Sequence, residues 1–290
     1  MSSSSGNTTD TLSDSTYSSA PSSPPDSTTE LLFIASHLES LNDLFQGLKP
    51  QEILKWCLLT LPDLYQTTAF GLTGLVILDM LSKADVSHES QAAPLIFLDT
   101  LHHFPETYDL VKRVRKHYTN TPLHIYTPEG VDSEKLFTQK YGEKLWITNE
   151  TLYDYLVKVE PSQRSYKNLN VKAVLTGRRR SQGGKRGDLE IIEVDETGLV
   201  KINPLANWSF TEVQSYVHEN HVPYNTLLDR GYQSVGDWHS TSPVGEGENE
   251  RAGRWKGQEK TECGLHENSR FGRVMLEMES QKLPEGLASA

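Results

Sequence analysis

The feature that most constrains the fold of this chain is a continuous apolar run at residues 94–98, Pro-Leu-Ile-Phe-Leu. A run without polar residues is typical of a central parallel strand that is covered on both faces. Further short strands are predicted at 64–67, 123–126 and 171–175, and a buried helix is predicted at 72–83. Strands that alternate with helices predict an α/β fold, with a mainly parallel sheet and helices on both of its faces.

The pattern changes after the strand at 171–175. Residues 190–194 and 199–202 flank a glycine-containing turn, which predicts a hairpin. Ser209-Phe210-Thr211-Glu212 resembles a capping box and predicts the start of a helix. Residues 241–262 are rich in Gly, Glu, Arg and Lys and show little periodicity, so we expect a mobile loop there.

The chain is expected to have three parts. Residues 1–29 are rich in Ser, Thr and Pro and cannot bury enough apolar surface to offset the entropy of ordering, which predicts a disordered tail. Residues 30–240 are expected to form an α/β nucleotide-binding domain. Residues 241–290 are expected to form a mobile C-terminal segment, and this segment contains Cys263.

Composition excludes several classes of protein. The net charge of −11 argues against non-specific nucleic-acid binding, and no apolar run approaches the ~20 residues of a membrane span. Two cysteines cannot supply a disulfide framework or a four-thiolate metal or iron–sulfur site, so we expect no metal. Residues 1–30 contain no Lys or Arg, which argues against a secretory signal and a transit peptide. We therefore expect a cytoplasmic protein.

Three predicted strand ends carry polar residues suited to a nucleotide. In open α/β sheets, ligands bind beyond the carboxyl ends of the strands, and helix N-termini there favour phosphate. Taken singly, the first segment is an ordinary turn, Asp99 a cap and the arginines surface residues; taken together, they favour a nucleotide site. The candidates are Thr67, Thr68, Ala69, Phe70, Gly71, Asp99, Thr100, Gly177, Arg178, Arg179 and Arg180.

Cys263 is the candidate nucleophile of the C-terminal segment. The other cysteine, Cys57, lies in an apolar run, where burial explains it. Arg251, Arg254 and a protonated His266 would lower the pKa of the Cys263 thiol, and the arginines would equally suit an anionic substrate.

Two residues of the same region have two interpretations each. His239 is either a ligand contact or a satisfied structural histidine, and Trp255 is either part of the site or a packing residue. Tyr232 is a candidate polar helper near the thiol. The basic residues Lys185 and Arg186, like the run at 178–180, are candidates to hold a sulfate or a phosphate group.

Five segments in collinear order resemble the phosphoadenylyl-sulfate (PAPS) reductase family, in its fungal assimilatory form. They are Gln66-Thr67-Thr68-Ala69-Phe70-Gly71, Leu98-Asp99-Thr100-Leu101-His102-His103-Phe104-Pro105-Glu106-Thr107, Thr176-Gly177-Arg178-Arg179-Arg180-Ser181-Gln182, Ser234-Val235-Gly236-Asp237-Trp238-His239-Ser240 and Glu262-Cys263-Gly264-Leu265-His266. The resemblance runs from about residue 50 to residue 272. The segment at 262–266 is highly specific when it is joined to the Arg-Ala-Gly-Arg-Trp segment at 251–255.

The resemblance implies a fold, a reaction and partners. The fold would be the adenine nucleotide α-hydrolase-like fold, with residues 67–71 as a modified phosphate loop and with Asp99 and residues 176–180 lining the nucleotide site. The reaction would convert PAPS and reduced thioredoxin into sulfite, adenosine 3′,5′-bisphosphate and oxidised thioredoxin, with Cys263 as the nucleophile. The paired cysteines of the iron–sulfur relatives are absent, which implies the cluster-free branch with no bound cofactor. A homodimer is also implied.

Two other classes of function stay open at the level of sequence. A hydrolase or ligase acting on ATP would need a phosphate loop closer to Ser-Gly-Gly-x-Asp-Ser than residues 66–71 supply. A nucleotide sensor that has kept the fold would bind the bisphosphate without thioredoxin-dependent turnover, and the intact Cys263 argues against it.

Overall fold

The computed structural model describes residues 33–84 and 93–258, together with residues 260, 262, 264, 265, 271, 272, 274 and 275. The predicted tail at 1–29 lies outside the described residues. Within the described part of the chain, every helix is too short or too polar to cross a membrane.

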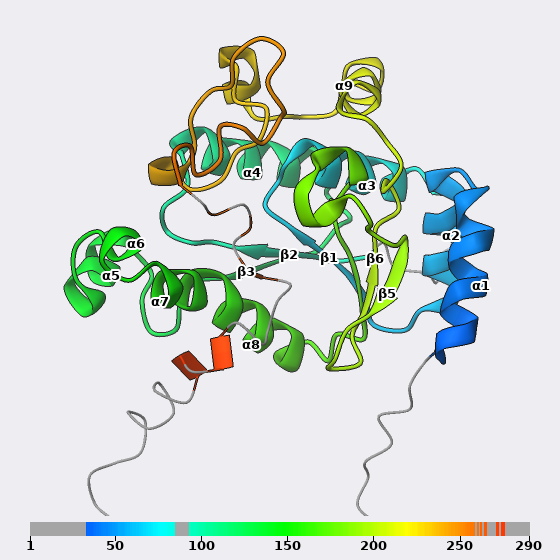
Figure 1. Ribbon diagram of the computed structural model, residues 1–290, viewed down its shortest axis with the longest axis horizontal. Helices are drawn as coiled ribbons and strands as arrows, with labels where there is room; N and C mark the ends of the chain where they lie inside the picture. The colour runs from blue at the N-terminus through cyan, green and yellow to red at the C-terminus, as the bar shows by residue number, and fades with distance from the viewer. Residues whose placement is uncertain are drawn as a thin grey trace, which may run out of the picture. The chain divides into compact units, whose positions relative to one another are not determined.

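A six-stranded sheet forms the centre of the fold (Figure 1). Its strands run in the order β3-β2-β1-β4-β6-β5, and all neighbours are parallel except β5 and β6. The strands are β1 (Leu64–Thr68), β2 (Leu95–Leu98), β3 (Leu123–Tyr126), β4 (Ala173–Leu175), β5 (Ile192–Val194) and β6 (Val200–Ile202). The mainly parallel sheet is the predicted one, and the antiparallel pair is the predicted hairpin.

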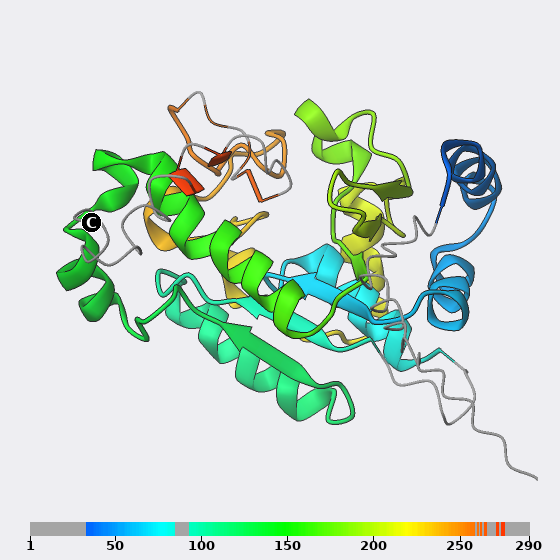
Figure 2. The same ribbon diagram turned by 90° about the horizontal axis from the view of Figure 1, so that it is seen from below.

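Helices cover the two faces of this sheet. Figure 1 shows α3 and α4 on one side of the strands and α8 on the other, and Figure 2 views α8, in green, from below. The helices up to β3 are α1 (Ala35–Gln46), α2 (Pro50–Thr60), α3 (Leu72–Ser82) and α4 (Pro105–His117). After β4, α9 (Phe210–Glu219) begins with the predicted capping box: Ser209 Oγ accepts from the Glu212 N–H at 3.2 Å, and Glu212 accepts from the Ser209 N–H at 2.7 Å.

Strand β2 shows why the apolar run predicts a central strand. All four of its residues are buried. Successive side chains of a strand point to opposite faces. Leu95 and Phe97 accordingly join the core formed with α2, α3, α4 and α9, whereas Ile96 and Leu98 pack into a second core beside α8. A polar residue at any of these positions would be buried on one face or the other.

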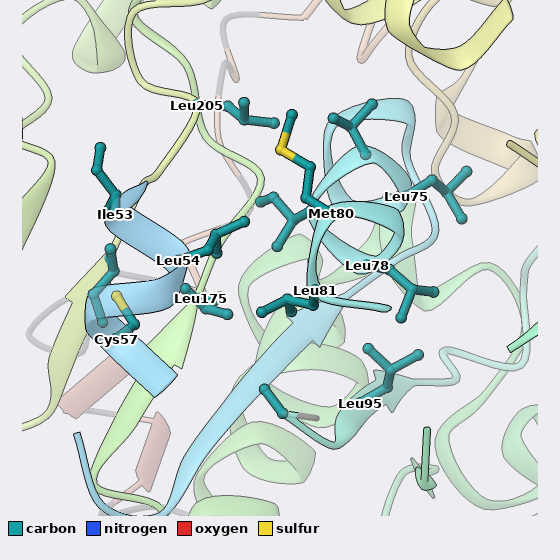
Figure 3. Packing of buried hydrophobic residues seen from close by; sticks show 14 of the residues in the cluster. Ile53, Leu54, Cys57, Leu75, Leu78, Met80, Leu81, Leu95, Leu175 and Leu205 are labelled. Atoms are coloured by element: carbon teal, nitrogen blue, oxygen red, sulfur yellow. The ribbon is translucent and has the colours of Figure 1, made fainter. Parts of the chain in front are cut away.

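Cys57 belongs to the larger core. Figure 3 shows it on α2 beside Ile53 and Leu54, near Leu175 of β4 and the leucines of α3. Its side chain is fully buried, and burial raises the pKa of its thiol. The thiol is therefore a packing group and not a nucleophile.

A helical region between β3 and β4 has no counterpart among the sequence predictions. It comprises α5 (Glu134–Tyr141), α6 (Leu145–Thr148), α7 (Glu150–Asp154), the π-helical turn η1 (Tyr155–Val159) and α8 (Glu160–Asn168). Local caps start two of these elements: Ser133 accepts from the Leu136 N–H at 3.4 Å, and Asn149 accepts from the Leu152 N–H at 3.1 Å. The π-helical turn matters for the site, because it carries Lys158.

Candidate active site

A cavity of about 270 Å³ lies beyond the carboxyl ends of β1, β2 and β4. Its walls include the loops that follow these three strands, the π-helical turn, the segment at 232–237, residues between 250 and 255, Glu262 and Leu265. This is the edge of an open α/β sheet at which ligands are expected. Residues more than 150 positions apart in the chain thus share one cavity.

The loop after β1 has the form of an anion-binding turn. Phe70 holds a left-handed backbone with φ of +55°, and its N–H donates to Thr68 Oγ1 at 2.9 Å. Its ring is buried 5.1 Å from the ring of Phe97, so packing stabilises a conformation that a bulky residue otherwise avoids. Helix α3 follows at once, and its first N–H groups have no partner within the helix. The positive end of α3 therefore faces the cavity region.

The loop after β4 packs directly on the start of α3. A Cβ at Gly177 would lie 3.1 Å from the backbone nitrogen of Gly74. Even a methyl group at 177 would require the neighbouring backbone to shift by a few tenths of an ångström. The loop after β4 (residues 176–180) and the start of α3, which follows the loop after β1 (residues 67–71), are thus in close backbone contact.

The three arginines after β4 have different surroundings. Arg178 lines the cavity and pairs with Glu193 on β5. Arg179 also lines the cavity, but its side chain is almost fully buried. Arg180 turns away from the cavity, where its Nε donates to the carbonyl of Leu189 at 2.7 Å. Adjacent residues in this extended segment therefore serve different partners.

The Arg179 side chain has a structural role. Its Nε donates to Thr73 Oγ1 at 2.9 Å, and one Nη donates to Ser181 and to the carbonyl of Trp208. The other Nη donates to both carboxylate oxygens of Glu250. A guanidinium has five N–H donors, and these bonds engage all of them. Arg179 therefore orients the segment at 250–255 and has no donor left for a nucleotide.

A buried carboxylate organises the other side of the cavity. Asp237 accepts from Thr100 Oγ1 at 2.6 Å, and Lys158 Nζ lies 3.1 Å from its Oδ2. Lys158 also reaches Asp154 at 3.2 Å. Burial alone would raise the pKa of Asp237, but Lys158, His103 and the Thr100 hydrogen bond together hold it well below the ordinary value. The cavity thus contains an ionised Asp237 and a fixed ammonium group.

His239 belongs to an aromatic cluster behind this network. Its ring stacks on Trp146, with the ring centroids 4.1 Å apart, and its Nε2 is hydrogen-bonded to Tyr153 Oη at 2.9 Å. Burial and the nearby Lys158 lower the pKa of His239 to about 4, against the opposing effect of Asp237. His239 is therefore neutral at neutral pH. These contacts are those of a satisfied structural histidine.

Residues between 250 and 255, together with Glu262 and Leu265, line the cavity on the remaining side. Trp255 is buried under a cation: the Arg254 guanidinium carbon lies 4.5 Å from its ring centroid. A Cβ on Gly236 would lie 2.4 Å from Arg254 Nη2, so a larger residue at 236 would displace the end of this arginine side chain. Glu262 accepts from Arg186 at 2.6 and 2.8 Å.

Most of the predicted site residues come together at the cavity. Those that line it are Thr67, Thr68, Ala69, Phe70, Gly71, Thr100, Gly177, Arg178, Arg179, Tyr232, Arg251, Arg254 and Trp255.

Five other predicted residues stand apart from this lining. Asp99, Arg180 and His239 are not part of it. Asp99 instead accepts from the Leu101 N–H and from Tyr108 Oη, each at 2.9 Å. Cys263 and His266 lie outside the described residues, but Glu262 and Leu265 beside them line the cavity.

The sequence predictions missed the acidic partners and Lys158. Glu250, Asp237 and Glu262 all line the cavity and are paired with basic groups. Asp237 and Glu262 occur inside the segments that resemble the family, and this position was a signal that could have identified them. Lys158 lies in a π-helical turn that was not predicted, and no sequence pattern marked it. Within the residues that the structure describes, no cluster of three His, Cys, Asp or Glu is placed to hold a metal ion.

Comparisons with known proteins converge on one family. A model described as "Phosphoadenosine phosphosulfate reductase domain" matches residues 63–243. The chain is 60% identical over 262 residues to phosphoadenosine phosphosulfate reductase of Emericella nidulans, covering 90% of this chain and 85% of that protein. It is 56% identical over 230 residues to the Saccharomyces cerevisiae enzyme, covering 78% and 87%. The crystal structure of PAPS reductase from Candida auris, a phosphate complex, matches with a TM-score of 0.66 and 56% identity, over 72% of this chain and 98% of that one.

Proposed function

Because the chain belongs to the phosphoadenosine phosphosulfate reductase family, we propose that it reduces PAPS to sulfite with reduced thioredoxin as the electron donor. The observation that carries the proposal is the cavity at the sheet edge. The loops after β1 (residues 67–71) and β4 (residues 176–180), Lys158 and five arginines meet there, next to the residues that flank Cys263. The Candida auris relative was solved with phosphate, an anion of the kind that such a cavity would hold.

The first step of the proposed reaction transfers a sulfonate group. The Cys263 thiolate attacks the sulfur of the PAPS sulfonate, and a sulfur–sulfur bond forms. The bond from that sulfur to the 5′-phosphate oxygen breaks, and the oxygen keeps the electron pair. Adenosine 3′,5′-bisphosphate leaves, and Cys263 becomes S-sulfocysteine. Charge grows on the leaving phosphate, and Arg254 and the N–H groups at the start of α3 would stabilise it, since both border the cavity.

The second step releases sulfite. A thioredoxin thiolate attacks the Cys263 sulfur, and the sulfur–sulfur bond breaks with its electron pair on the departing sulfite. The second thioredoxin thiol then attacks the mixed disulfide, which restores the Cys263 thiol and leaves thioredoxin oxidised. The two electrons that reduce the sulfonate come from the thioredoxin dithiol, and no bound cofactor stores them.

Partners and location form the finer part of the proposal. The resemblance to the fungal family implies a homodimer, thioredoxin as the redox partner and a cytoplasmic location. Sedimentation equilibrium of the purified chain measures the oligomeric state, and a monomer at micromolar concentration would remove the dimer from the proposal.

A single-turnover experiment tests the proposed function. The protein is mixed with sulfur-labelled PAPS without thioredoxin, and the peptides are mapped by mass. We expect one sulfonate on Cys263, discharged as sulfite when reduced thioredoxin is added. The matched variant Cys263→Ser should bind adenosine 3′,5′-bisphosphate normally and release no sulfite. Normal turnover by that variant would reject Cys263 as the nucleophile. Binding of the nucleotide by the wild type without any label would reject the mechanism and favour a nucleotide sensor.

A further inference from the structure

Glu262 is held by two arginines from different parts of the chain. Its Oε1 accepts from Arg186 Nε at 2.6 Å, and its Oε2 accepts from Arg186 Nη2 at 2.8 Å. Arg251 Nη2 lies 3.4 Å from Oε2. Burial would raise the pKa of Glu262, but the two guanidinium groups lower it, so the carboxylate is ionised. A bidentate pair of this kind fixes direction as well as distance.

Arg186 is itself fixed by the loop after β4. It ends the short 3₁₀ turn η3 (Gly184–Arg186), and its Nη1 donates to Gln182 Oε1. The same Gln182 oxygen accepts from the backbone N–H of Arg179 at 3.1 Å. The Arg186 side chain that binds Glu262 is therefore held against the cavity wall by both backbone and side-chain contacts.

Covalent geometry passes this restraint to the next residue. Consecutive Cα atoms are about 3.8 Å apart, so fixing Glu262 limits where residue 263 is found. On the far side, Leu265 lines the cavity and packs against the core beside α8. Both flanks of Cys263 are thus attached to the cavity wall.

We propose that Glu262 is a positioning residue, which Arg186 and Arg251 hold so that Cys263 is presented to the sulfonate of the bound nucleotide. The inference rests on the proposed function of Cys263. It assigns to Glu262 a role in sulfonate transfer and none in nucleotide affinity, because a carboxylate does not attract an anionic substrate.

A positioning role predicts that Glu262→Gln affects two reactions of Cys263 differently. Replacing Glu262 by Gln removes a negative charge from the residue that precedes Cys263 in the chain and releases two guanidinium groups, and both changes favour the thiolate. A small alkylating reagent, which needs only a thiolate, should react with Cys263 as fast as before or faster. Sulfonate transfer, which needs the thiolate at one place, should become slower.

The experiment compares these two rates in Glu262→Gln and wild type. The first is the rate of S-sulfocysteine formation on Cys263 in a single turnover, which we expect to fall at least about tenfold. The second is the rate of Cys263 alkylation by iodoacetamide, mapped by peptide mass, which should not fall. The Kd of adenosine 3′,5′-bisphosphate should not rise by more than about threefold, because the released Arg186 and Arg251 line the cavity and would favour an anion.

Two further variants separate positioning from folding. Arg186→Lys keeps the charge and loses the bidentate contact, so its transfer rate should lie between those of wild type and Glu262→Gln. Adding Glu262→Gln to Arg186→Gln should cost little beyond Arg186→Gln alone, because the two residues act through one contact. Glu248→Gln is the matched control: it lies in the same segment, is exposed and faces Lys256 at 3.9 Å, so it should transfer at the wild-type rate.

The outcomes distinguish this inference from the proposed function. If wild type forms no S-sulfocysteine, the proposed function fails. If wild type forms it and Glu262→Gln does so equally fast, only the positioning role is overturned. A parallel loss of alkylation and transfer in Glu262→Gln would also overturn it, because the residue would then act on the thiol and not on its placement.

Discussion

The buried pair between Arg179 and Glu250 predicts a large loss of stability on a small chemical change. In Glu250→Gln, the Arg179 guanidinium would stay buried, since its side chain is 1% exposed, but its counter-charge would be gone. Breaking a buried pair by removing one partner typically costs about 3–5 kcal/mol. Two charges 4 Å apart at an effective dielectric constant of 20 interact by about 4 kcal/mol, which agrees with that range.

Urea denaturation measures this loss directly, and thermal denaturation gives a second reading. At about 2–4 °C per kcal/mol for a domain of this size, Tm should fall by roughly 6–20 °C. The exposed Glu248→Gln should shift the free energy of unfolding by less than about 0.5 kcal/mol. The paired variant Arg179→Met with Glu250→Leu should be more stable than Glu250→Gln, because no buried charge is left alone. A loss below about 1 kcal/mol in Glu250→Gln would refute the reasoning, since that is the magnitude of a solvent-exposed pair.

Two further expectations concern the arginine run and pH. Arg178→Gln should raise the KM for PAPS at least about tenfold and Arg180→Gln less than twofold, because Arg178 lines the cavity and Arg180 does not. Equal effects in steady-state kinetics would contradict the assignment. Folding lowers the pKa of His239 from 6.5 to about 4. Between these two pH values the unfolded chain binds a proton that the folded chain does not, so the free energy of unfolding falls as the pH drops from 6.5 to 4. Urea denaturation from pH 7 to pH 4 should show a shallower decline in His239→Gln than in wild type, and identical slopes would exclude His239 as the cause.

The sheet was predictable because its strands carry their own signals. The run at 94–98 lacks polar residues since both faces of β2 are covered, and the hairpin of β5 and β6 has its glycine at Gly198, where φ is +84°. The family resemblance and the adenine nucleotide α-hydrolase-like fold are both confirmed. The elements from α5 to α8 escaped prediction because they are short and one is a π-helical turn, so no regular helical period develops.

The site was predictable in its loops and not in its pairings. Glycines, hydroxyl groups and arginines that occur together at successive strand ends favour an anion site. Which arginine serves the substrate depends on acids far away in the chain: Glu250 is 71 residues from Arg179, and Glu262 is 76 residues from Arg186. No local pattern records such a partner. The run at 178–180 therefore looked uniform in sequence, although its members have three different surroundings.

The order of the strands has a consequence for how the cavity appears during synthesis. Strand β1 lies between β2 and β4, so Leu64 gains its partner Ala173 only after more than a hundred further residues have been made. The cavity wall is later still, since it includes Glu262 and Leu265. Chains are made from the N-terminus and contacts distant in sequence form slowly. A ribosome-bound chain that ends before these residues would contain the loops after β1 and β4 but would lack one side of the cavity. Bound nucleotide would therefore stabilise only chains whose synthesis is nearly complete.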